Sequence, residues 1–323
     1  MQTKIVYVLV SQESDFFYEM FLMSHYSLRL YHPKGDVEVN LIMDMDTYQR
    51  LKEKQAEILQ DVIPIVSYVP KEYSVMQRSR YLKTSMRELL QGDFLYLDTD
   101  TIVCHSLDAV DSFKTDICLV RDNHQGKVDN YQVDQVSDVL GWKHLAETKL
   151  FNGGVIYVKD SIQGHDFFKK WHESWKLCAS HGFNKDQLSL RWVVSQSENI
   201  IKELDGTWNC QVSMPSSIEY QNDAIIMHYF SSAVCRKHFD ICCDSTLMIV
   251  RLCGTINNFV AEKIKFSNRA FIFQCAYLTH QDFVLLNNVL STKKDYPKYF
   301  WFIVKVSELH KRFRETIYKI RHH

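Results

Sequence analysis

Along the first 160 residues, short apolar runs alternate with longer segments whose apolar residues have helical spacing. Ile5–Val10 is a continuous apolar run, as expected of a strand buried on both faces of a sheet. The same pattern predicts further strands at Val37–Met43, Ile63–Val69, Phe94–Leu97, Ile117–Val120 and Phe151–Val158, and helices at Phe16–Tyr31, Thr47–Leu59, Arg78–Leu90 and Phe167–Cys178. Strands that alternate with helices predict an α/β domain with a largely parallel sheet.

The pattern changes in the last third of the chain. A short strand is expected at Ala224–Met227, and helical segments dominate after about residue 236. The final segment carries an apolar stripe at helical spacing, formed by Val306, Leu309, Phe313, Ile317 and Ile320. We therefore expect an α/β domain over residues 1–235 and a helical C-terminal extension over residues 236–323.

Glycine is scarce, with ten in 323 residues, and no two are separated by a single residue. The chain therefore has no G-x-G-x-x-G fingerprint and no G-x-x-x-x-G-K-[ST] loop, the usual backbone cradles for dinucleotides and ATP. A phosphorylated ligand would need its charge neutralised in another way. The 38 basic and 39 acidic residues nearly cancel, so nothing indicates a nucleic acid partner.

The nine cysteines are odd in number and include no C-x-x-C, which favours reduced thiols over a disulfide framework. The N-terminal residues lack the apolar region of a signal peptide, and no apolar run approaches the length of a membrane span. These features predict a cytoplasmic protein, either free or peripheral to the inner face of a membrane.

Two carboxylates, Asp98 and Asp100, directly follow the predicted strand Phe94–Leu97. In extended backbone, residues i and i+2 point to the same side, so these like charges repel unless a cation lies between them. Ligands of open α/β sheets bind at the carboxyl ends of the strands, and carboxylate oxygens suit Mg²⁺ or Mn²⁺. The alternative is a solvated turn, as we expect for Asp44-Met45-Asp46 at a helix start.

Other polar residues strengthen the cation hypothesis. Arg80 and Lys83 lie on the helix that precedes the strand, where they can face an anionic ligand. His228 follows the last short strand, and a neutral imidazole can complete a site made of two aspartates. Gly153-Gly154 is the one pair of adjacent glycines, and it allows a ligand to approach the backbone closely.

Taken in order, the motifs resemble those of glycosyltransferase family 8, which includes glycogenin and bacterial lipopolysaccharide glucosyl- and galactosyltransferases. The matching motifs are Leu95–Asp100, Phe151–Val155, Asp186-Gln187, Trp208-Asn209 and Ile226–Tyr229, and the resemblance covers residues 5 to about 232. It implies a GT-A fold and a retaining transfer of a hexose. The donor would be UDP-glucose or UDP-galactose, the acceptor a glycan of lipopolysaccharide type, and the cofactor Mn²⁺ or Mg²⁺.

The resemblance also implies roles for individual residues. Asp98, Asp100 and His228 would bind the metal, which would bridge the donor diphosphate. The catalytic residues around the transferred sugar would be Asn152, Asp186 and Gln187, although Asp186 could instead be a helix N-cap and Asn152 a turn residue. The loop with Val10, Ser11 and Asp15 would hold the base and ribose. Further substrate contacts would come from Arg80, Lys83, Asp98, Thr99, Gly153, Gly154 and Ser231.

The sequence departs from the family after His228. Family members usually continue His-x-x-Gly-x-x-Lys, with the Lys on the diphosphate, whereas this chain has Ser231 and Val234 at those positions. Arg236 or Lys237 is the candidate replacement for the missing Lys.

Retention of configuration at the transferred sugar leaves two reaction routes open. A double displacement needs Asp186 or Gln187 as nucleophile, whereas a front-side route needs none. The weak nucleophilicity of an amide favours the front-side route unless Asp186 is placed to attack.

Two other function classes compete with the transferase. A haloacid-dehalogenase-type phosphatase also places Asp-x-Asp after a strand, but usually near the N-terminus, and no downstream Lys and acidic pair is evident here. A non-catalytic, glycan-binding homologue is favoured by the missing Lys at position 234 and opposed by the retention of Asp98, Asp100 and His228.

The tail from residue 291 carries nine Lys and Arg against three acidic residues, and five aromatic residues precede its last helix. Basic, aromatic and amphipathic character together predict contact with an anionic membrane surface, which would suit a lipid-linked saccharide acceptor. The alternative is a helix that packs on the core with a solvated basic face. Acceptor contacts are expected in Tyr73–Gln77 and Asn123–Glu147.

Overall fold

The computed structural model describes residues 1–124, 130–143, 145–212, 217, 219–229, 240–269 and 305. The chain divides into two compact units, Met1–Asn268 and Arg269–His323. The strands of the first unit are β1 (Lys4–Leu9), β2 (Val39–Met43), β3 (Ile63–Val66), β4 (Phe94–Leu97), β5 (Thr101–Val103), β6 (Ile117–Arg121), β7 (Phe151–Val158), β8 (Ile201–Leu204), β9 (Cys210–Gln211) and β10 (Ile226–His228). Its α-helices are α1 (Phe17–Tyr31), α2 (Met45–Lys54), α3 (Val75–Leu89), α4 (Asn130–Leu140), α5 (Ile162–Ser180), α6 (Gln187–Ser195), α8 (Asp244–Cys253) and α9 (Asn258–Lys265).

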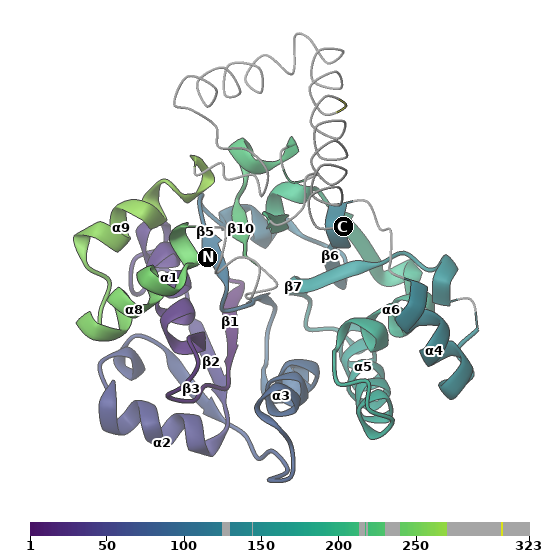
Figure 1. Ribbon diagram of the computed structural model, residues 1–323. Coiled ribbons are helices and arrows are strands. Elements are labelled where there is room, and N and C mark those ends of the chain that lie inside the picture. The colour runs from purple at the N-terminus through teal and green to yellow at the C-terminus, as the bar shows by residue number, and fades with distance from the viewer. Residues whose placement is uncertain are drawn as a thin grey trace, which may run out of the picture. The chain divides into compact units, whose positions relative to one another are not determined.

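A seven-stranded sheet with the order β3-β2-β1-β4-β7-β6-β8 forms the centre of the unit (Figure 1). Strand β1 pairs in parallel with both β2 and β4, whereas β7 is antiparallel to both of its neighbours, β4 and β6. The sheet is therefore mixed and largely parallel, and the predicted α/β fold class is confirmed. Because Val6 pairs with Tyr96, the carboxyl ends of β1 and β4 lie side by side.

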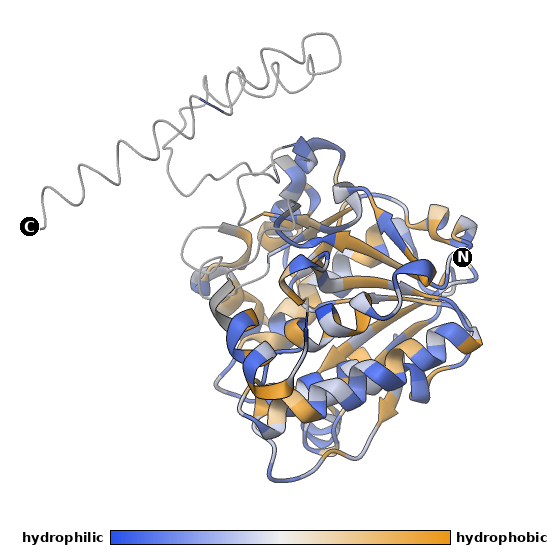
Figure 2. Cartoon of the chain, turned by 90° about the vertical axis from the view of Figure 1, so that its right-hand side faces the viewer, coloured by the Kyte–Doolittle hydropathy of each residue, from blue (hydrophilic) through white to orange (hydrophobic). Residues whose placement is uncertain are grey.

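Helices cover both faces of the sheet, because alternate side chains of a strand point to opposite faces. On one face, Tyr7 of β1 packs with Phe21 of α1 in a buried apolar cluster. On the other face, Val8 of β1 belongs to a second cluster with Leu82 of α3 and Trp171 of α5. Figure 2 shows the apolar strands between helices of mixed polarity. This arrangement places α1 and α3 on opposite sides of the same strand ends.

A second, three-stranded sheet has the order β5-β10-β9. Its β5 begins immediately after Asp100, so the chain passes directly from the large sheet to the small one. A third apolar cluster joins this small sheet to α8 and α9 and includes Ile102, Met227, Leu247 and Val260. The segment Asp244–Lys265 therefore completes the core beside the Asp-x-Asp turn.

The expected elements differ from the observed ones mainly at their ends. The helix expected at Thr47–Leu59 begins earlier, at Met45, and ends at Lys54. Asp44 is its N-cap and accepts a hydrogen bond from the Thr47 N–H (2.9 Å), so this Asp-x-Asp is the predicted helix start. Among the described residues, no helix combines the length and apolar character needed to cross a membrane.

Candidate active site

The turn that carries Asp98 and Asp100 joins β4 to β5 and is held on three sides. The Asp98 N–H donates to the Gly154 carbonyl of β7 (2.8 Å). The Thr101 hydroxyl donates to the Asp98 carbonyl (2.8 Å), and the Tyr229 N–H donates to the Asp100 carbonyl (2.9 Å). Both carboxylates are therefore presented from a fixed backbone at the carboxyl end of β4.

His228 faces these carboxylates from the end of β10. Its Nε2 lies 3.3 Å from Asp100 Oδ1 and 3.9 Å from Asp98 Oδ2, and one ligand atom from each residue lies within 4.8 Å of the others. Two carboxylates and an imidazole in this arrangement suit a divalent cation such as Mn²⁺.

Gly154 allows the imidazole to approach the backbone of β7. A Cβ at this position would lie 2.1 Å from His228 Cε1 and 2.7 Å from its Nδ1, far inside van der Waals contact. At Gly153 the nearest atoms to such a Cβ, on Leu190 and Lys83, lie 3.5 Å away, which is an ordinary contact. The space that His228 occupies therefore depends on the missing side chain of Gly154 in particular. This close placement of His228 beside Asp98 and Asp100 supports the fit of a cation to the three residues.

Asn152 lies inside strand β7, not in a turn, at a point where the register with β6 shifts. Its side chain is almost fully buried. Its Oδ1 accepts from the Gly154 N–H (2.8 Å) and from Asn209 Nδ2 (3.0 Å), and its Nδ2 donates to Asp122 Oδ1 (2.9 Å). The side chain of Asn152 thus forms hydrogen bonds within the structure that surrounds the candidate metal ligands.

Two cations from α3 hold the carboxylate of Asp186. Arg80 Nε lies 3.0 Å from Oδ1, and Lys83 Nζ lies 3.1 Å from Oδ2. Lys83 is almost fully buried and also lies 3.1 Å from Asp98 Oδ1, which accepts a hydrogen bond from the Tyr96 hydroxyl as well. Burial would raise the pKa of Asp186, but the charges of Lys83 and Arg80 prevail and lower it to about 2. Asp186 is therefore anionic at neutral pH.

Asp186 occupies the N-cap position of α6, as the alternative interpretation expected. Its side chain makes no capping hydrogen bond, however, because both carboxylate oxygens are turned toward Arg80 and Lys83. The next residue, Gln187, donates its side-chain amide to the Phe151 carbonyl at the start of β7. The structure thus brings Asp186 and Gln187 to the same strand end as Asp98.

The loop after β1 is organised mainly by its own residues. The carboxylate of Asp15 accepts from the Ser11 hydroxyl (2.9 Å) and from the N–H groups of Gln12 (2.7 Å) and Phe17 (3.1 Å). Val10 is buried in the core, so only its backbone faces the loop. The loop lies at the same sheet edge as Asp98, because β1 and β4 are parallel neighbours.

Arg251 of α8 also holds this loop, and the sequence pattern did not predict it. Its Nε lies 2.7 Å from Glu19 Oε1, its Nη2 donates to the Asp15 carbonyl, and its guanidinium lies 4.3 Å from the centre of the Phe16 ring. Nothing in the local sequence links Arg251 to a loop more than 230 residues earlier.

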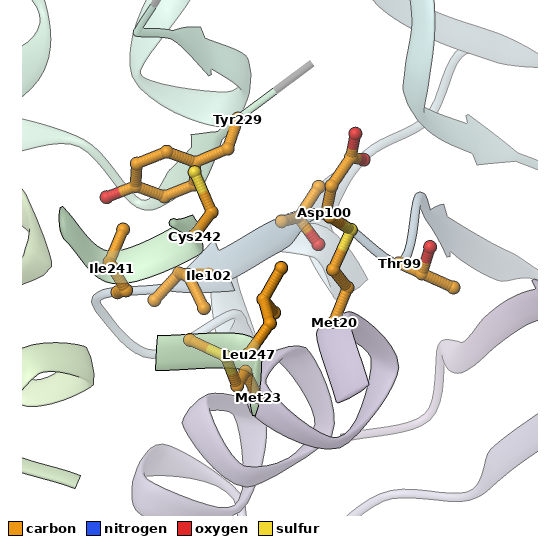
Figure 3. A pocket seen from close by; sticks show the side chains of 10 residues that line it. Met20, Met23, Thr99, Asp100, Ile102, Tyr229, Ile241, Cys242 and Leu247 are labelled. Atoms are coloured by element: carbon orange, nitrogen blue, oxygen red, sulfur yellow. The ribbon is translucent and has the colours of Figure 1, made fainter. Parts of the chain in front are cut away.

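An apolar pocket lies against the Asp-x-Asp turn (Figure 3). It encloses only about 20 Å³ and is lined by Met20 and Met23 of α1, by Leu247 of α8, and by Thr99 and Asp100 of the turn. In Figure 3 the Asp100 carboxylate points away from the methionine side chains. The pocket is too small for a sugar. Its apolar lining covers the side of the turn that faces α1 and α8.

A second group with metal-ligand atoms within reach of one another consists of His32, Asp36 and Asp108. Here His32 Nε2 accepts from the Leu107 N–H (2.8 Å), and Nδ1 lies 2.7 Å from Asp36 Oδ2. Both ring nitrogens are therefore engaged within the fold, so this group is a structural connection and not a candidate metal site.

Several expectations fall outside the described residues. They include Ser231 and Val234, the replacement candidates Arg236 and Lys237, and all of the tail from residue 291 except position 305. Within the described part, the site also includes three residues for which the sequence predicted no role: Asn209, Asp122 and Tyr96. Asn209 stands in one of the matching motifs, but its partners are 57 and 19 residues away along the chain.

Known proteins resemble this chain in part of its sequence and in its fold. Residues 39–199 match the family model described as nucleotide-diphospho-sugar transferase. The solved structure of the galactosyltransferase LgtC with donor and acceptor sugar analogues aligns with a TM-score of 0.50 at 14% identity, covering 81% of this chain and all of that one. Mouse xyloside xylosyltransferase 1 aligns at 0.49 and 14% identity, covering 72% of this chain and 98% of that one. No curated protein sequence matches.

The family match includes strands β2 to β7, both cations of α3, the Asp-x-Asp turn, Asn152, Asp186 and Gln187. The structural alignment with LgtC shows that the two proteins share a fold. The resemblance to glycosyltransferase family 8 is thereby confirmed. The chain belongs to the nucleotide-diphospho-sugar transferases, a glycosyltransferase family with the GT-A fold.

Proposed function

We propose that this transferase moves a hexose, with retention of configuration, from UDP-glucose or UDP-galactose to a glycan or lipopolysaccharide-type acceptor. The observation that carries the proposal is the convergence of Asp98, Asp100 and His228 at the carboxyl end of β4, next to the basic residues of α3. The family match supports a nucleotide-sugar donor. These three side chains would hold Mn²⁺ or Mg²⁺, which stabilises negative charge on a leaving diphosphate.

The basic residues of α3 would act on the sugar side of the site. Arg80 and Lys83 are engaged with Asp186, so their first effect is to fix the direction of that carboxylate. A fixed carboxylate beside the Gln187 amide offers acceptors and a donor for sugar hydroxyls. Asp186 and Gln187 would therefore orient the transferred hexose.

The ion pairs of Asp186 bear on the route to retention. A carboxylate with a cation on each oxygen is a weak nucleophile, because its negative charge is already compensated. This favours the front-side route, in which the acceptor hydroxyl attacks from the face that the diphosphate leaves. Asp186 would then bind the sugar and form no covalent bond with it.

A cavity of about 240 Å³, lined in part by the residues that precede Asp186 in the chain, supports the expected acceptor region. It is lined by Met76, Gly182, Phe183, Asn184, Lys185 and Leu188. Gln77 Nε2 donates to Asn184 Oδ1 (3.0 Å) and joins the start of α3 to this lining. Tyr73–Gln77 thus remains our candidate for acceptor contacts. A lipid-linked saccharide acceptor, with the basic tail on the inner face of the membrane, completes the proposal for a cytoplasmic enzyme.

The cation assignment is tested by Asp98→Asn. We expect this variant to stay folded and to lose at least about 100-fold of Mn²⁺-dependent transfer or hydrolysis of the nucleotide sugar, because metal stabilisation of the leaving group is worth several kcal/mol. The matched control is Asp46→Asn in the other Asp-x-Asp, where the side chain is 84% exposed. Wild-type turnover by Asp98→Asn would refute the assignment.

The same assay separates the competing classes. Phosphate release from phosphomonoesters without any use of nucleotide sugars would favour the phosphatase. Thermal stabilisation by UDP without turnover would favour a non-catalytic homologue, because a ligand that binds the folded state raises its stability whether or not it reacts.

A further inference from the structure

A buried chain of hydrogen bonds runs from His228 to Asp122 behind the candidate metal ligands. His228 Nδ1 lies 2.9 Å from Asn209 Oδ1, Asn209 Nδ2 donates to Asn152 Oδ1 (3.0 Å), and Asn152 Nδ2 donates to Asp122 Oδ1 (2.9 Å). Asn209 is fully buried and His228 is 2% exposed. The two asparagines come from different elements, the 3₁₀ helix Gly206–Asn209 and strand β7.

The direction of every bond in this chain follows from one backbone group. The Gly154 N–H can only donate, and it points at Asn152 Oδ1 (2.8 Å), so that atom is the carbonyl oxygen. An oxygen there requires the NH₂ group of Asn209 to face it. The carbonyl oxygen of Asn209 must then face His228. Because that oxygen only accepts, Nδ1 of His228 carries a hydrogen.

This hydrogen determines which nitrogen of the neutral ring has the lone pair. With a proton on Nδ1, the lone pair belongs to Nε2, the atom that faces Asp98 and Asp100. Histidines that bind metals are usually oriented in this way, by a hydrogen bond from the other ring nitrogen. Here the orienting group is a neutral amide whose own direction is set by the backbone of β7.

We propose that Asn209 is a positioning residue that holds His228 in its Nδ1–H tautomer, so that Nε2 is ready to bind the cation. The inference rests on the proposed metal role of Asp98, Asp100 and His228. It assigns Asn209 no contact with substrate. It also explains why Gly154 bears on the site twice, through the space it leaves for His228 and through the N–H that orients Asn152.

The test compares two substitutions of similar size, Asn209→Asp and Asn209→Leu, by titration with Mn²⁺ and detection of free Mn²⁺ by electron paramagnetic resonance. Asn209→Asp keeps an acceptor for Nδ1–H, so we expect its Mn²⁺ affinity to stay within about tenfold of the wild type. Asn209→Leu removes the acceptor, and we expect a loss of about 10- to 100-fold. Asn40→Leu, at a buried asparagine of β2, is the matched control for loss of a buried amide.

A role in packing alone would give the reverse order, because leucine suits an apolar interior better than a carboxylate does. That order, or an unchanged affinity in Asn209→Leu, would overturn the inference and leave the proposed function standing. Failure of the wild type to bind Mn²⁺ would overturn both the proposed function and the inference.

A measurement on the wild type alone guards against variants that do not fold. With histidine labelled with ¹⁵N and Mg²⁺ bound, we expect the ring of His228 to carry its proton on Nδ1 and none on Nε2. A proton on Nε2 under these conditions would overturn the inference.

Discussion

At the scale of single residues, the two adjacent glycines of β7 have different surroundings. Gly154 leaves room for the imidazole of His228, whereas Gly153 faces Leu190, Lys83 and Asp186 at ordinary contact distances. In the sequence the two glycines stand out because they are adjacent, but the sequence does not show that their surroundings differ. The distinction arises from β10, more than 70 residues later in the chain.

We predict that Gly154→Ala destabilises the fold by about 2 kcal/mol and weakens Mn²⁺ binding, because its methyl group would displace His228. Chemical denaturation and Mn²⁺ titration measure both effects. Gly153→Ala is the matched control, and its free energy of unfolding should stay within about 0.5 kcal/mol of the wild type. Equal stability of the two variants would contradict the geometry.

At the scale of elements, α8 reaches the loop after β1. Arg251 joins α8 to Glu19 of α1 and to the Asp15 carbonyl, and Glu19 is only 4% exposed. The proposed nucleotide loop is therefore held from outside the Asp-x-Asp region, by a helix that lies beyond the family match.

We expect Arg251→Gln to lower the affinity for UDP by about tenfold and the free energy of unfolding by about 2 kcal/mol, because Glu19 loses its buried partner. Calorimetric titration with UDP and denaturant unfolding provide the two measurements. Lys265→Gln, at an exposed lysine of α9, is the control. Unchanged UDP affinity in Arg251→Gln would show that the loop does not depend on α8.

The contact of α5 with α3 predicts a dependence of stability on pH. His172 of α5 lies 2.8 Å from the Thr84 hydroxyl of α3, and burial, together with the charge of Lys176, lowers its pKa from 6.5 to about 4. Between these values the unfolded chain binds the proton and the folded chain does not, so stability falls as the pH falls from about 6.5 to about 4.

The His172→Gln variant should lose part of this fall, by an amount on the order of 3 kcal/mol. Urea unfolding at a series of pH values between neutrality and the lowered pKa measures it. His25 has its pKa lowered in the same direction, so a fall will remain in the variant. His181→Gln, at an exposed residue after the same helix, should match the wild type. A His172→Gln curve parallel to that of the wild type would disprove the assignment.

Longer elements were predictable from the sequence, and short ones were not. β1 is a continuous apolar run, and α1 is long enough for its apolar residues to show helical spacing. β5 and β9 have three and two residues, too few for any period to appear, and they exist because β10 pairs with both. The reversed direction of β7 was also hidden, because a buried strand has the same composition in either direction.

At the scale of the whole molecule, the compact unit that contains the site extends to Asn268, because α8 and α9 contribute to the cluster beside the Asp-x-Asp turn. The predicted boundary between residues 235 and 236 stays a prediction. The basic tail begins beyond this unit, so the site and the proposed membrane contact can be separated by truncation.

A chain that ends at Asn268 should fold and keep its Mn²⁺ binding, yet lose co-sedimentation with vesicles containing phosphatidylglycerol. The full chain should sediment with them at low salt and less so at high salt, because contact with anionic lipid is largely electrostatic. Equal sedimentation of both chains would remove the tail from the proposal.

By itself, the sequence determined the α/β alternation, the Asp-x-Asp turn at the end of β4 and the basic residues of α3. These depend on residue type and on spacing within one element, which a linear chain displays directly. Only the tertiary structure decided the ion-pair partners of Asp186, the hydrogen bonds that lead from His228 through Asn209, and the contact of Arg251 with the loop after β1. Each joins residues far apart in the chain, and hydrogen bonds and ion pairs depend on distances that only folding sets.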